Sequence, residues 1–125
     1  MDINAIIEKL KAAYPGKKII LNDKNNLTEI VCEIDPTSLH PNYSIVIAVI
    51  DQSIPHYHKI TEESYEILKG ELTLWINDQS YVLKEGEKMS VKPGLTHWAK
   101  GDETWVKVSS HPGWTKEDHL ISPFR

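Results

Sequence analysis

His56-Tyr57-His58-Lys59-Ile60-Thr61-Glu62-Glu63 places two histidines and two carboxylates within eight residues. On an extended strand, side chains at i and i+2 point to the same face and lie about 6–7 Å apart along the chain. His56 and His58 therefore face the same side. Imidazole nitrogens and a carboxylate oxygen together suit divalent transition metals. His97, which follows the turn residues Pro93-Gly94, can supply a further ligand from elsewhere in the chain.

The spacing of this stretch resembles the first motif of the cupin superfamily, HxH-x(3,4)-E-x6-G. Here the pattern is formed by His56, His58, Glu63 and Gly70. The resemblance implies an all-β fold, an antiparallel double-stranded β-helix of the RmlC-like jelly-roll type. It also implies that His56, His58, Glu63 and His97 hold one divalent transition metal per chain, such as Zn, Mn, Fe or Ni.

A second cupin motif, G-x5-P-x-G-x2-H-x3-N, is matched in register by Gly86, Gly94 and His97. Pro93 stands one place later than this pattern asks, as in Val-x-Pro-Gly-x-x-His variants of the family. Ile50 replaces the glycine that opens the first motif, and Gly101 replaces the asparagine that closes the second. Both positions shape loops, so we expect them to affect loop geometry more than metal binding. The resemblance covers roughly residues 43–110.

Either Glu62 or Glu63 is the carboxylate ligand, because the motif tolerates both spacings after His58. The interval from Glu63 to the next glycine favours Glu63. Strand parity agrees, because Glu63, Tyr65 and Ile67 share one face. If Glu63 points into the barrel, Tyr65 and Ile67 line it, and Glu62 is a solvated loop charge.

Composition indicates one globular domain. The chain has 125 residues, 40% of them hydrophobic and 26% charged, as is usual for such a domain. The formal charge of −4 gives no reason to expect a nucleic-acid partner. The longest aliphatic run, Ile45–Ile50, is too short for a membrane span. Met1–Asn4 does not resemble a secretory signal, and the single cysteine, Cys32, fits a reducing compartment, so we expect the cytoplasm.

We divide the domain, residues 1–125, into an N-terminal helix at 1–14, a barrel at 43–110 and a tail at 111–125. Ile3, Ile6, Ile7 and Leu10 recur at helical spacing, and Asp2 is a candidate N-cap. Their apolar stripe should dock on the outside of the barrel. After Gly16 the chain reads as short strands separated by turns. These strands are expected at Lys18–Leu21, Thr28–Ile34, Tyr43–Ile50, Glu63–Lys69, Leu72–Ile76, Tyr81–Leu83, Lys88–Val91 and Thr104–Ser109.

Other polar and aromatic residues carry weaker predictions. Tyr43, Tyr65 and Glu66 are the nearest acid–base candidates by sequence. We expect the ligand pocket to be lined by Tyr65, Ile67, Trp98 and the Tyr43–Ile50 strand. Cys32 is expected to be a buried thiol. His40, His111 and His119 are expected to be surface or tail histidines rather than metal ligands.

These features predict a metal-binding protein, with the metal leaving open positions for a small-molecule substrate or water. The first hypothesis is an enzyme on a small polar metabolite, either a sugar or sugar-phosphate isomerase or an enzyme of keto or hydroxy acids. Glu117-Asp118 weakly favours the isomerase, because it resembles the tail of cupin sugar-phosphate isomerases.

Three alternatives to this hypothesis stay open. They are a metal-dependent dioxygenase, a non-catalytic ligand-binding or sensor cupin, and a metal-free sugar-nucleotide epimerase, against which the intact ligand set argues. Small cupins usually pair, so we expect a homodimer in which Thr28–Ile34 adds to a partner's sheet.

Overall fold

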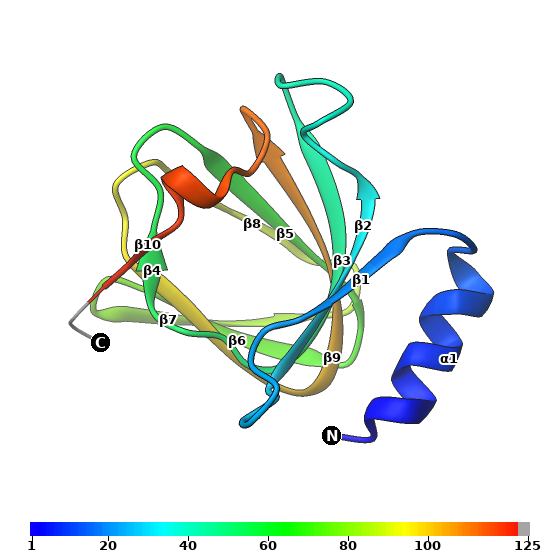
Figure 1. Ribbon diagram of the computed structural model, residues 1–125. Coiled ribbons are helices and arrows are strands. Elements are labelled where there is room, and N and C mark those ends of the chain that lie inside the picture. The colour runs from blue at the N-terminus through cyan, green and yellow to red at the C-terminus, as the bar shows by residue number, and fades with distance from the viewer. Residues whose placement is uncertain (123–125) are drawn as a thin grey trace.

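The chain folds into a curled antiparallel barrel with one helix packed on its outside (Figure 1). This computed structural model describes residues 1–122; the rest of the predicted tail, residues 123–125, lies outside the described residues. The elements are α1 (Ile3–Ala13), β1 (Lys18–Leu21), β2 (Glu29–Asp35), β3 (Ser44–Gln52), β4 (His56–Tyr57), β5 (Glu62–Lys69), β6 (Glu71–Ile76), β7 (Gln79–Lys84), β8 (Lys88–Val91), β9 (His97–His111), the 3₁₀ turn η1 (Lys116–Asp118) and β10 (Leu120–Ile121).

The longest strand, β9, connects the two sides of the barrel. It spans 15 residues and pairs with β3, β4, β5 and β6. The sequence predicted a strand that begins at Thr104, whereas the observed strand begins at His97 and only shifts its register against β3 between Lys100 and Thr104. Gly101 fits at this irregularity because a Cβ there would lie 2.4 Å from Oγ1 of Thr104. One strand thereby carries His97 at its start and pairs with β3 and β5 further on.

The N-terminal helix covers one outer face of the sheet, as the sequence predicted. Asp2 caps it, since the Asp2 carboxylate accepts a hydrogen bond from the backbone N–H of Ala5 at 3.2 Å. Two helix residues, Ile6 and Leu10, are buried. They pack against the outward face of β2 and β3, in a cluster that includes Ile30, Cys32, Ile47 and Val49. Cys32 is a fully buried free thiol, also as predicted.

Side chains alternate along β2, so the face opposite the helix lies inside the barrel. Ile30 and Cys32 pack beneath the helix, and Glu29, Val31 and Glu33 line an internal cavity. A second core fills the part of the barrel interior around the later residues of β5, with Ile67, Leu72, Leu74, Leu83, Val91, Ala99 and Val106 among its members. The cavity therefore occupies only part of the interior. No helix within residues 1–122 has the length and apolar character of a membrane span.

The proposed dimer contact must be placed differently from the sequence prediction. β2 lies between β1 and β3, so it has no open edge within the described chain. Strand β1, which pairs only with β2 among the described strands, is one edge that a partner could extend. We predict a homodimer that uses β1, with twice the chain mass in light scattering at micromolar concentration. A monomeric mass would contradict it.

Candidate metal centre

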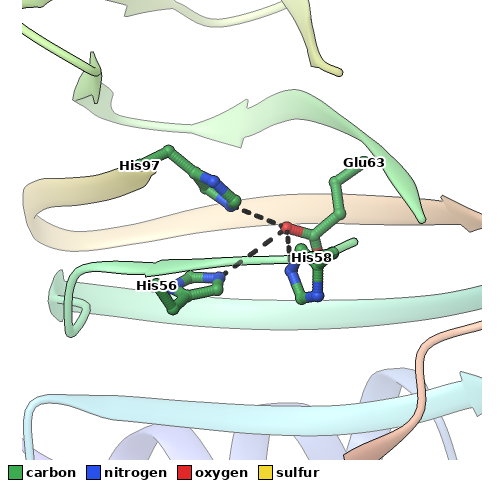
Figure 2. A group of neighbouring side chains, drawn as sticks. All are labelled: His56, His58, Glu63 and His97. Carbon is green, nitrogen blue, oxygen red and sulfur yellow. Dashed lines mark hydrogen bonds and ion pairs between the residues drawn. The ribbon is translucent and has the colours of Figure 1, made fainter. Parts of the chain in front are cut away.

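Three separate elements bring the four predicted ligands together. His56 is the first residue of β4, His58 follows that strand, Glu63 is in β5, and His97 begins β9. His56 and His97 are register partners. All four are buried, and their ligand atoms lie within 4.8 Å of one another. Figure 2 shows the three imidazole rings directed at the Glu63 carboxylate.

The structure separates the two candidate carboxylates. Oε1 of Glu63 lies 2.9 Å from Nε2 of His97, 3.1 Å from Nε2 of His58 and 3.8 Å from Nε2 of His56. The Glu62 carboxylate instead pairs with Nζ of Lys92 at 3.3 Å. The motif spacing and the strand parity that favoured Glu63 therefore placed the correct side chain in the cluster.

Backbone carbonyls fix the tautomer of each histidine. Nδ1 of His56 contacts the carbonyl oxygen of Ile54 at 2.7 Å, Nδ1 of His58 that of Asp118 at 2.7 Å, and Nδ1 of His97 that of Leu95 at 2.9 Å. A carbonyl oxygen can only accept a hydrogen bond, so each Nδ1 carries the proton. In the neutral imidazoles, all three Nε2 lone pairs therefore face the cluster.

This arrangement fits a metal cation. Three lone pairs and a carboxylate that face one another are all acceptors, and one further proton on a histidine would satisfy only one of the contacts. Nε2 of His58 is buried and has no hydrogen-bond partner within the described chain, which is costly for a polar atom. A divalent ion would satisfy all four ligand atoms at once, because each of them can donate an electron pair to it. Burial raises the pKa of the Glu63 carboxyl, but the hydrogen bonds and positive charge that the histidines supply when protonated hold that pKa well below its usual range.

The C-terminal turn η1 supports the ligand loop through Asp118. The buried Asp118 carboxylate accepts hydrogen bonds from the backbone N–H groups of Lys59 at 2.8 Å, and of Ile60 and Thr61 at 3.2 Å. These residues form the loop between His58 and Glu63. Burial works against ionisation of Asp118, but the hydrogen bonds of this loop lower the pKa of the carboxyl. One residue thus holds the loop and also orients His58 through its carbonyl.

His119 lies in the predicted tail and outside the group of four ligands, but the tail folds back so that His119 is partly buried beside that group. Pairing of β10 with β4 brings the tail back to the strand that carries His56. The His119 ring stacks on the His56 ring, with centroids 4.4 Å apart. Nδ1 of His119 accepts a hydrogen bond from Nε1–H of Trp114 at 3.2 Å, so Nε2 carries the proton. Burial and the neighbouring histidines lower the pKa of His119 to about 4.

A cavity of about 440 Å³ adjoins the cluster and exposes only part of the predicted lining. His56, Glu63 and Tyr65 line it, together with Val46, Ala48 and Ile50 of β3 and with His119. Ile67 and Trp98 do not, because Ile67 is in the barrel core and the Trp98 ring stacks on Trp75 at 4.0 Å. Glu29 also lines the cavity, although no sequence motif pointed to this residue.

The other sequence candidates lie away from the cluster. The exposed Tyr43 ring stacks on His40, whose own ring nitrogen contacts Asp35. Glu66, on the opposite face of β5 from Tyr65, lies 4.0 Å from Nζ of Lys88. His111 is exposed, as expected. Of the three acid–base candidates, the structure brings only Tyr65 to the site, where its hydroxyl lies 3.4 Å from Oε1 of Glu63.

The sequence profile of the cupin domain matches residues 36–108, more than half of the chain. The chain belongs to the cupin family. Comparison with curated proteins found no match.

Similar solved structures have the same fold at low sequence identity. The nucleoside dehydratase Pac13 of Streptomyces superposes with a TM-score of 0.72 at 12% identity, covering 89% of this chain and 95% of Pac13. KdgF from Halomonas sp. gives 0.66 at 14% identity, over 81% of this chain and 91% of KdgF. The Fe(II) form of HppE gives 0.64 at 14% identity, over 77% and 56%. These similarities establish the fold.

Removing the Asp118 carboxylate should weaken metal binding without removing a ligand. Asp118→Asn keeps the side-chain size but loses the charge that holds the backbone between His58 and Glu63. We expect zinc affinity to fall by about 10- to 100-fold, as for other outer-shell partners of metal ligands. Competition with a chromophoric chelator measures it. The control is Glu117→Gln, at the exposed neighbouring position. Equal affinities in both variants would contradict this role.

Glu29 should make the stability of the metal-free protein depend on pH. Burial, followed by the charge of Glu63, raises the pKa of Glu29 to about 7 in the folded chain. The folded state then binds a proton that the unfolded chain has already released, so the wild type loses stability as pH rises from about 5 to about 8. Glu29→Gln removes that loss. Relative to wild type it should gain roughly 2 kcal/mol over this interval, measured by urea unfolding. The exposed Glu71→Gln should show no such gain, and parallel pH curves for wild type and Glu29→Gln would contradict the prediction.

Proposed function

We propose that this cupin is a metal-dependent enzyme that acts on a small hydroxy-carbonyl compound, with isomerase-like proton transfer as its reaction. The observation that carries the proposal is the position of the ligand cluster. Four ligand atoms converge in the wall of a cavity, and two of the ligands, His56 and Glu63, line that cavity. An ion held there would have a side open to a small molecule.

The size and walls of the cavity support a small substrate. A volume of about 440 Å³ lies within the range of small-molecule sites. Its walls are largely aliphatic, with Val46, Ala48, Ile50 and Val108 among them. Such walls restrict water, and the few polar groups among them would determine how a ligand is oriented. The cavity has no room for a polymer.

Side chains near the cluster can donate hydrogen bonds to a substrate whose carbonyl group a metal ion polarises. When bound, a divalent ion acts as a Lewis acid that polarises a carbonyl group. Burial, followed by the charges of Glu63 and Glu29, raises the pKa of the Tyr65 phenol well above its usual range. Tyr65 therefore keeps its proton at neutral pH and serves as a hydrogen-bond donor rather than a base. His119 offers a second donor, Nε2–H, since its Nδ1 accepts from Trp114.

A metal-dependent dioxygenase is the second candidate function. Three histidines and one glutamate also suit iron, and aliphatic walls can accommodate an apolar substrate as readily as a polar one. The identity of the metal separates the two candidates. Iron in protein purified without an affinity tag would favour a dioxygenase, and zinc or manganese would favour an isomerase or lyase.

The metal should depend on the predicted ligands. His58→Ala and His97→Ala each remove one nitrogen donor from the cluster, so we expect neither variant to retain stoichiometric metal in elemental analysis. The wild type should retain one ion per chain. His111→Ala, at an exposed histidine away from the cluster, is the matched control. Full occupancy in either ligand variant would remove the basis of the proposal.

Turnover tests the enzymatic part of the proposal. The metal-loaded wild type is incubated with sugars, sugar phosphates, and keto and hydroxy acids, and products are followed by NMR. Conversion by the wild type that is lost in His97→Ala would support an enzyme. Saturable binding of one of these compounds without conversion would favour a sensor instead.

A further inference from the structure

Two carboxylates of β2 face the interior of the barrel. Because side chains alternate along a strand, Glu29 and Glu33 point away from the helix-covered face that holds Ile30 and Cys32. Both line the cavity that also contains His56 and Glu63. Glutamates are rarely directed inward unless they have a partner. An inward carboxylate that is not part of the ligand cluster therefore calls for a functional explanation.

The Glu29 carboxylate has no partner among the described residues. Among residues 1–122, its carboxylate forms no hydrogen bond and no ion pair; Asn22 contacts only its backbone N–H, at 3.1 Å. The charge that acts on it is that of Glu63, which has the same sign. Glu29 is half-buried, so its carboxylate loses part of its hydration without gaining a protein partner, and this costs free energy. A ligand that donates a hydrogen bond would offset this cost.

The charge of the cavity restricts which ligands suit it. The titratable groups that line it with Glu29 are Glu33, His56, Glu63, Tyr65 and His119, and no Lys or Arg of residues 1–122 is among them. The metal ion, whose charge Glu63 partly neutralises, would attract any anionic group, but a phosphate or carboxylate group would also meet the carboxylates of β2 and no basic side chain that offsets their repulsion. A hydroxyl group, in contrast, can donate to Glu29 and carries no charge.

We propose that Glu29 is the second anchor of the ligand and accepts a hydrogen bond from one of its hydroxyl groups. Glu29 thereby selects uncharged, hydroxylated molecules over their phosphorylated or carboxylated counterparts. The inference rests on the proposed function, because it requires that a small molecule occupies the cavity beside the metal cluster. It narrows the substrate class from hydroxy-carbonyl compounds in general to neutral ones, such as free sugars.

Matched pairs of probes test this selection. Calorimetry on the zinc-loaded protein at about pH 8 compares dihydroxyacetone with dihydroxyacetone phosphate, and D-fructose with fructose 6-phosphate. We expect the wild type to bind the neutral member of a pair about tenfold more tightly. Glu29→Met, similar in size but without a hydrogen-bonding oxygen, should lower the affinity for the neutral compound by about tenfold. Glu29→Gln keeps an acceptor, so it should restore part of that affinity while losing discrimination against phosphate.

The controls separate this inference from the proposed function. Glu71→Gln, at an exposed position on the outside of the barrel, should bind all four compounds like the wild type. Zinc content is measured on each sample, and a wild type without zinc would contradict the proposed function. A zinc-loaded wild type that prefers the phosphorylated compounds, or binds none of the four, would overturn the inference alone. So would a Glu29→Met variant that retains zinc and wild-type affinities.

Discussion

Three hydrogen bonds from imidazole Nδ1–H groups to backbone carbonyls orient the candidate metal site. The acceptors belong to Ile54 and Leu95, each two residues before its histidine, and to Asp118, 60 residues from His58. The site therefore depends on local strand geometry for two ligands and on the C-terminal turn for the third. Each bond sets the tautomer of one histidine and directs its Nε2 lone pair inward. The consequence is a buried group of acceptors around Glu63 that is unfavourable without a cation. The same buried acceptors therefore favour metal binding and make this part of the metal-free protein costly to fold.

Strand pairing determines how precisely these ligands meet. β9 is hydrogen-bonded to four other strands, and its first residue, His97, is opposite His56 of β4. Beyond the irregularity at Gly101 the same strand pairs with β5, which carries Glu63. Ligands on such a framework move little relative to one another. The loop between His58 and Glu63 has no strand partner of its own, and Asp118 supplies the missing constraint from the C-terminal turn.

The cavity combines an apolar wall with a few unsatisfied polar groups. Aliphatic residues of β3 restrict water, which strengthens electrostatic interactions within the cavity. In this environment a proton remains on Tyr65, and Glu29 becomes easier to protonate. Groups with such shifted pKa values cluster at functional sites. The barrel thus tolerates polar side chains in its interior that a purely structural core would exclude.

Local periodicity and spacing determined much of this protein from the sequence alone. They determined the helix with its buried residues Ile6 and Leu10, the burial of Cys32 and the choice of Glu63 over Glu62, because these depend on neighbours a few residues apart. Other features depend on contacts between distant segments. Pairing of β10 with β4 decided the place of His119, the fold of the C-terminal turn decided the role of Asp118, and closure of the barrel gave Glu29 a cavity to face. Strand pairing likewise extended the predicted strand Thr104–Ser109 back to His97, since β6 pairs with the residues before Thr104.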